Sequence, residues 1–227
     1  MYKRQVSFIP GFLALLILVF LVREREGVPS KTRLFSDVRR VFSGSFLWLL
    51  LAVAVFSLGA FNFSFVLVKA EELNVPMALV PVVYGVINVF HTIIAIPSGV
   101  LSDVIGKEKV LIVGYAVFAV SVFLLWASNS QLHAFLIAAV YGVYTGVVET
   151  VQRALIPKYA PKELRGTAYG LYYLAVGSCF LVANIVVGAL WDAIGITAAA
   201  AYSTTTTIIA IVSLSLLLLR KPHKTEA

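Results

Sequence analysis

Charged side chains and glycines gather between Gly99 and Val110, in the stretch GVLSDVIGKEKV. Apolar runs lie on both sides of this stretch, so Asp103 stands at the edge of a buried segment. A carboxylate in that position needs a partner, because burying it alone is costly. Lys107 and Arg153 are the candidate partners. The alternative is a solvated turn carboxylate that caps the following helix.

Glu149 and Arg153 form a second candidate pair. They are four residues apart with the acid first, which is the spacing and order that favour an ion pair on a helix. A structural pair and a role in a gate or in proton handling are both open. One hypothesis joins Asp103, Glu149 and Arg153 in a single cytoplasmic network.

Uncharged polar residues interrupt the apolar runs. Asn88 and His91 are three residues apart and therefore share one helix face. Polar groups at such depth point to the bundle interior or to a water-filled cavity. His91 is either an inter-helix hydrogen-bond partner or a ligand for substrate or a proton. We expect no charged residue near mid-membrane, which favours a neutral, amphipathic or weakly basic solute.

The elements that must position these residues are long apolar helices. The 227 residues are 60% hydrophobic and 13% charged, with a mean hydropathy of +0.96. Soluble domains carry roughly 25% charged residues, and a spanning helix needs about 20 apolar residues. The runs that qualify are about 6–22, 46–68, 79–101, 110–127, 133–152, 167–190 and 196–219. The sequence therefore predicts an all-α polytopic membrane protein with about seven transmembrane helices.

The basic residues orient these spans. Every lysine and arginine except Lys3, Arg4 and Lys69 follows the first, third, fifth or seventh run. Positively charged loops stay in the cytoplasm. We therefore expect a multi-pass protein of the cell (plasma) membrane, with its N-terminus outside and a cytoplasmic tail at 220–227. This distribution accounts for the net charge of +7, so the charge does not indicate a nucleic-acid partner.

The pattern G-x-L-x-D-x-x-G occurs twice, as Gly99–Gly106 after the third run and as Gly188–Gly195 after the sixth. Two three-span units with the same motif on opposite faces are typical of inverted repeats. The units are predicted at 46–127 and 128–219. Residues 1–27 would form a separate first span, and 28–45 an amphipathic cytoplasmic linker. Glycines at 142, 146, 170, 177 and 188 are read as helix-packing residues.

The stretch from Gly99 to Val110 resembles the signature loop of the major facilitator superfamily, with Val104 and Glu108 standing where basic residues are usual. The stretch ETVQRALIPKYAPKELRGTAYG, from Glu149, resembles the family's connection between its tenth and eleventh spans. The resemblance covers the C-terminal half of the fold plus the preceding span. It implies that six spans form a 3+3 inverted-repeat half, with alternating access around a midplane site.

The resemblance also implies two groups of functional residues. Asp103 and its loop would latch one conformation, and the cytoplasmic pair would belong to the gate. The latch and gate residues would be Gly99, Asp103, Gly106, Lys107, Glu149 and Arg153. A substrate cavity would be lined by Asn62, Tyr84, Asn88, His91, Tyr141, Tyr144, Tyr172 and Asn184.

We therefore expect secondary active transport of a small solute, by efflux or coupled to an ion such as a proton. The expected partners are the lipid bilayer, a small-molecule substrate, and either a missing N-terminal half or a second copy of the chain. The alternative is a non-transporting membrane protein, either a seven-span receptor or an assembly subunit of a split transporter. We expect no cofactor, no metal and no enzymatic activity, because the sequence contains no H-E-x-x-H, no nucleophile elbow and no paired mid-membrane aspartates.

Overall fold

The computed structural model describes residues 8–21, 38, 40–42 and 44–219, and divides the chain into two compact units, 1–33 and 34–227. In the first unit, α2 (Phe8–Leu21) has 14 mostly apolar residues. Such a helix is about 21 Å long, shorter than the roughly 30 Å hydrocarbon core of a bilayer. Most of the linker expected at 28–45, and the tail at 220–227, lie outside the described residues.

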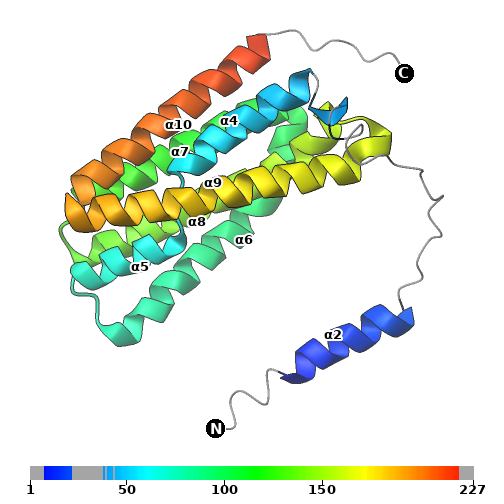
Figure 1. Ribbon diagram of the computed structural model, residues 1–227. Helices are drawn as coiled ribbons and strands as arrows, with labels where there is room; N and C mark the ends of the chain where they lie inside the picture. Colours follow the sequence, from blue (N-terminus) through cyan, green and yellow to red (C-terminus); the bar gives the residue numbers. More distant parts are fainter. Residues whose placement is uncertain (1–7, 22–37, 39, 43, 220–227) are drawn as a thin grey trace. The chain divides into compact units, whose positions relative to one another are not determined.

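The second unit is a bundle of long apolar helices (Figure 1). Six described stretches are long and apolar enough to cross a membrane, in agreement with the predicted all-α polytopic class. They are α4 (Ser45–Gly59) with α5 (Phe63–Glu72), α6 (Val80–Ile105), α7 (Lys107–Ala127), α8 (Gln131–Tyr159), α9 (Arg165–Ala193) and α10 (Ile196–Leu219). Short 3₁₀ turns, η1 (Met77–Leu79) and η2 (Lys162–Leu164), lead into α6 and α9.

Two helices extend well beyond the apolar runs that predicted them. α6 ends at Ile105 instead of residue 101, and α8 at Tyr159 instead of residue 152. The added turns carry charged residues, so a prediction from hydropathy ends the span before them. Long charged side chains near a helix end can nevertheless reach the polar interface, and the helix continues. The added turns bring Asp103 and Arg153 into helices, and Glu149 lies in α8 as well.

The motif Gly99–Gly106 is helical except at its last residue. Gly106 alone turns the chain, with φ +105°, and α7 begins at the next residue; Gly195, with φ +114°, has the same role before α10. Side chains of L-residues are strained at such angles. Gly99, the first glycine of the motif, lies inside α6 and does not turn the chain.

The two copies of the motif lie at opposite ends of α7. Gly106 directly precedes this helix, whereas Trp126, in its last turn, donates from Nε1 to Oγ1 of Thr197 at 3.1 Å. Thr197 follows Gly195 by two residues, and the 21 residues of α7 span about 31 Å. This is the placement that an inverted repeat requires.

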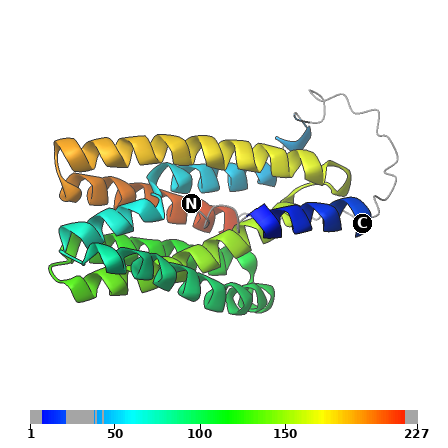
Figure 2. The ribbon, with the colours of Figure 1, turned by 90° about the horizontal axis from the view of Figure 1, so that it is seen from below.

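The helices of the two predicted three-span units interlock with each other. α8 packs most extensively against α6 and α7, while α4 packs against α9 and α10; α7 and α10 also contact each other. The first helix of each predicted repeat thus contacts the second and third helices of the other. Figure 2 shows α9 along one side of this bundle and the green helices α6, α7 and α8 along the other. The unit bounds, 46–127 and 128–219, remain predictions.

Glycines let α6 and α8 approach each other closely. A Cβ added at Gly142 would lie 2.4 Å from the carbonyl oxygen of Ile87, and one at Gly146 would lie 2.7 Å from that of His91. Small residues allow such backbone contact between helices in lipid. The packing interpretation holds for this pair, whereas Gly170 and Gly177 of α9 have open space where a Cβ would lie.

Residues 60–62 interrupt the first long span between α4 and α5. Irregular backbone at membrane depth persists only where protein groups or a water-filled cavity satisfy its hydrogen bonds. Here three side chains from later helices do so. The Tyr202 hydroxyl donates to Leu58 O (2.7 Å), the Tyr141 hydroxyl donates to Phe61 O (2.7 Å), and Asn184 Oδ1 accepts from the Asn62 N–H (2.9 Å).

Candidate functional site

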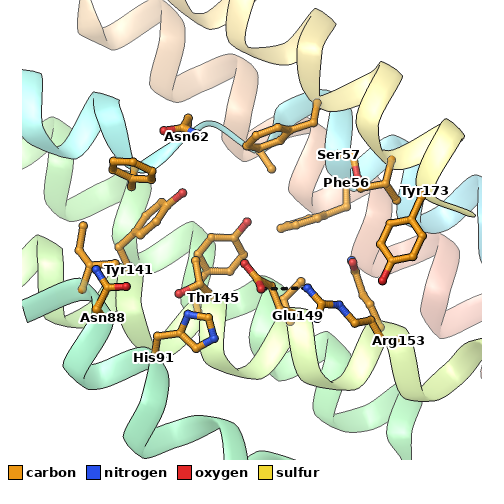
Figure 3. A pocket seen from close by; sticks show the side chains of 18 of the residues that line it. Phe56, Ser57, Asn62, Asn88, His91, Tyr141, Thr145, Glu149, Arg153 and Tyr173 are labelled. Atoms are coloured by element: carbon orange, nitrogen blue, oxygen red, sulfur yellow. Dashed lines mark hydrogen bonds and ion pairs between the residues drawn. The ribbon is translucent and has the colours of Figure 1, made fainter. Parts of the chain in front are cut away.

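A cavity of about 490 Å³ lies where the interrupted span faces α6, α8 and α9 (Figure 3). The break supplies Ala60 and Asn62, α5 supplies its first residue, Phe63, and α4 supplies Phe56 and Ser57. Asn62 is held in place because its Oδ1 accepts from the N–H of Ser64 at 2.9 Å, as the N-cap of α5. The helix break thus forms part of the cavity wall.

Nearly all the residues expected in a cavity lie in this one. Asn184 is the exception, because its Oδ1 accepts from Asn62 N–H and its Nδ2 donates to Phe180 O at 2.6 Å. It therefore braces the helix break. The predicted residues that line the cavity are Asn62, Tyr84, Asn88, His91, Tyr141, Tyr144 and Tyr172.

A charged pair also lines the cavity. Arg153 Nη2 donates to Glu149 Oε2 at 3.2 Å, and their side chains are 55% and 49% exposed. Figure 3 shows Glu149 between Thr145 and Arg153. α8 continues for ten residues beyond Glu149, to Tyr159, so the pair lies well inside this helix.

Asp103 is paired elsewhere. It forms an ion pair with Lys107, one turn further along, and its side chain is 69% exposed. Within the described part of the chain, no ion pair joins Asp103 to Glu149 or Arg153. The expectation of a single network is therefore wrong in this structure. The two pairs are separate (i, i+4) contacts.

Gln152 connects three helices beside the cavity, and sequence reasoning missed it. Its Nε2 donates to the Tyr115 hydroxyl on α7 at 2.9 Å, and its Oε1 accepts from the Tyr172 hydroxyl on α9 at 2.7 Å. All three residues are buried. An amide inside an apolar helix was the available signal, because a buried amide must find partners on neighbouring helices.

Glu108 forms a second cluster that the sequence did not reveal. Its side chain is only 3% exposed, and its Oε1 accepts from Lys158 and, at 2.6 Å, from the Tyr159 hydroxyl. This contact joins the start of α7 to the end of α8. Glu108 was noted only as a departure from the family motif; its partner lies 50 residues away and has no local signature.

Aromatic rings make up much of the cavity wall. Phe56 stacks on Tyr115 with ring centroids 3.8 Å apart, and Tyr141 meets Tyr144 edge-on at 5.2 Å. The ring centroids of Tyr84 and Phe63 are 4.8 Å apart. Among the described residues, no group of three His, Cys, Asp or Glu side chains could hold a metal ion. The site is suited to binding an apolar solute with a polar group.

A sequence model of the Major Facilitator Superfamily matches residues 47–227, which include the cavity and both copies of the motif. The chain belongs to this superfamily. The membership confirms the resemblance described above. The matched region begins two residues after the start of α4.

Relatives in the superfamily include two uncharacterised MFS-type transporters of Methanocaldococcus jannaschii. One is 29% identical over 82% of this chain and 48% of its own length; the other is 28% identical over 57% and 33%. A probable nitrate transporter, NarT, of Staphylococcus carnosus is 25% identical over 45% of this chain and 26% of its own length. The chain thus spans half or less of the length of these relatives.

Proposed function

We propose that this chain is part of a secondary active transporter that moves a small solute by alternating access, as efflux or coupled to an ion such as a proton. One observation carries the proposal: the polar and aromatic cavity lies at a helix break, between helices of the two interlocked repeats. Broken helices at a repeat interface form the midplane sites of many secondary transporters. A receptor or an enzyme would need no such inverted arrangement.

The chain works together with a second set of helices, either a separate N-terminal half or another copy of itself. α6 and α9 support this, because they flank the cavity and carry strongly exposed apolar side chains such as Ile96 (77%) and Leu174 (67%). Polar groups such as Asn88, which is exposed on α6, would otherwise face lipid. We place the N-terminus outside and the C-terminal tail in the cytoplasm of the plasma membrane.

Asp103 and Lys107 act as a latch at the end of the bundle that carries Gly106. The pair is exposed, so it contributes little to folding stability. In the full assembly, the Asp103 carboxylate faces the complementary half in one conformation and separates from that half in the other. Asp103→Asn should therefore slow transport several-fold without lowering the melting temperature.

Transport is tested on the assembly as the cell makes it. An antibody to residues 220–227 captures the chain from its native membranes, and the captured material is reconstituted in liposomes loaded with a cell extract. Mass spectrometry of the medium then identifies any solute that leaves. We expect saturable release of at least one solute, and no release from liposomes that contain this polypeptide alone.

Ala60→Trp provides the matched control, because Ala60 lines the cavity and an indole there would fill it. The release should stop in this variant. Release that persists with the cavity filled would refute transport through this site. Saturable release by the purified chain alone would refute the need for a second set of helices.

A further inference from the structure

Four hydroxyl groups of the cavity donate their hydrogens to other groups of the protein. Ser57 donates to Val53 O (2.9 Å) and Thr145 donates to Gly142 O (3.0 Å). The buried Tyr141 donates to Phe61 O, and the buried Tyr172 donates to Gln152 Oε1. A hydroxyl whose hydrogen is committed has only lone pairs left. These four groups can therefore only accept hydrogen bonds from a solute.

The remaining polar groups add acceptors. Asn88 donates from Nδ2 to Tyr84 O at 2.8 Å, which leaves its Oδ1 open. Glu149 lines the cavity; its Oε2 accepts from Arg153, and its Oε1 has no hydrogen-bond partner among the described residues. The guanidinium of Arg153 and the amide of Asn62 are donors, and the guanidinium is already paired. Groups that can both donate and accept a hydrogen bond, such as the His91 imidazole, favour neither a donor nor an acceptor on the solute.

The apolar part of the wall favours the same kind of solute. Eight aromatic side chains line the cavity: Phe56, Phe63, Tyr84, Tyr141, Tyr144, Tyr172, Tyr173 and Phe180. The faces of such rings carry partial negative charge and attract cations. A small inorganic anion, in contrast, needs several free N–H or O–H donors. Apart from side-chain amides and the paired Arg153 guanidinium, the donors of the lining are groups that also accept, such as the hydroxyls of Tyr84, Tyr144 and Tyr173.

We propose that the cavity takes amphipathic organic amines, with the ammonium group at Glu149 and the apolar body among the aromatic rings. This inference rests on the proposed transport function and names its substrate class. An ammonium group has N–H donors for the four hydroxyls whose hydrogens are committed and a charge for the carboxylate. The Glu149–Arg153 contact is no obstacle, because half-exposed (i, i+4) pairs contribute little free energy and exchange readily.

Three tritiated probes of similar size test the preference: 2-phenylethylamine, 2-phenylethanol and 3-phenylpropionate. Each is titrated into the full 227-residue chain in lipid nanodiscs, and binding to empty nanodiscs is subtracted. We expect saturable binding of the amine, at least tenfold tighter than that of the alcohol or the carboxylate. Equal affinities, tighter binding of the carboxylate, or no saturable binding of the amine would overturn the proposal.

Charge variants locate the probe in the cavity. Glu149→Gln should weaken amine binding at least tenfold and strengthen 3-phenylpropionate binding, because it frees the Arg153 guanidinium. Glu149→Asp keeps the charge and should retain most of the amine affinity. The control is Glu163→Gln, on the exposed turn η2 outside the cavity, which should change neither affinity. Unchanged amine binding in Glu149→Gln would overturn the proposal.

The transport assay separates this proposal from the proposed function. Saturable release of solutes other than amines, with no amine binding, would leave the transport function standing and refute the substrate class. Selective amine binding without solute release by the captured assembly would refute transport and leave an amine-binding site.

Discussion

Single residues decide where the wall of the cavity lies. Gly142 and Gly146 of α8 contact the backbone of Ile87 and His91 on α6, and both of these α6 residues line the cavity. Any side chain at either glycine would therefore move α6 and, with it, His91. The two glycines control the geometry of the site although they are not among the residues that line it.

Gly142→Ala should lower the melting temperature of the purified protein in detergent. Its Cβ would lie 2.4 Å from a backbone oxygen, which cannot rotate out of the way. Overpacking of this kind costs about 1–3 kcal/mol. Thermal unfolding followed by tryptophan fluorescence measures the change.

Gly170→Ala is the matched control, because a Cβ at that position of α9 meets nothing within 4 Å. Alanine is the better helix former by up to about 1 kcal/mol. The melting temperature should therefore stay the same or rise. Equal losses in the two variants would show that close packing is not the cause.

The residues of the cavity could be predicted where a polar or aromatic type interrupts an apolar run, as Asn88 and His91 do. Gln152 and Glu108 are equally polar, but their partners lie on other helices, so their roles depend on tertiary contacts. The charged pair on α8 was assigned to a gate and not to the cavity, although Glu149 lies within the run predicted at 133–152 and Arg153 directly follows it. A helix continues as long as its charged side chains can reach a polar environment.

At the level of elements, the break between α4 and α5 shapes the site. Tyr141 and Asn184 bond the freed backbone at Phe61 and Asn62, and Tyr141 and Asn62 also line the cavity. Hydropathy could not reveal this break, because the run from 46 to 68 is apolar throughout except for a few polar residues. By contrast, the repeat of the motif was visible in the sequence, since both copies keep the glycine that the turn requires.

Asn184→Ala should speed hydrogen exchange at the start of α5. The substitution leaves the Asn62 N–H without its acceptor, and a hydrogen bond contributes about 0.5–1.5 kcal/mol to stability. Exchange of peptides that cover residues 60–66 should rise roughly 2- to 12-fold. Mass spectrometry after deuterium labelling gives the rates.

The control for this experiment is Asn88→Ala. Asn88 also lies in the cavity, but its side chain bonds only within α6, at Tyr84 O. Exchange at residues 60–66 should match that of the unaltered protein. If both variants speed hydrogen exchange at residues 60–66, any loss of an asparagine near the cavity has this effect. The proposed stabilisation of the break by Asn184 of α9 would then be refuted.

At the level of the whole molecule, the described spans form one bundle in which the helices of the two predicted units interlock. The chain matches 48% of the length of its relative from Methanocaldococcus jannaschii. Its least covered helices, α6 and α9, stand next to the cavity. Complementary helices against these two would enclose the site from the open side.

The chain captured from native membranes should therefore migrate as a complex. Its own mass is 24.7 kDa, and a complementary set of six spans would roughly double it. Light scattering of the captured material, corrected for detergent, measures the protein mass, and a denaturing gel shows whether one or two polypeptides contribute. A single 24.7 kDa chain under both conditions would contradict the proposal.

The helix break also has a consequence for synthesis of the protein. The side chains that satisfy it, Tyr141, Asn184 and Tyr202, all emerge from the ribosome after α4 and α5. Until then the backbone at 60–62 has no partners in lipid, so an unbroken helix is the cheaper state for the newly inserted segment. We therefore expect the segment that forms α4 and α5 to enter the membrane as one helix and to break once these later helices pack against it.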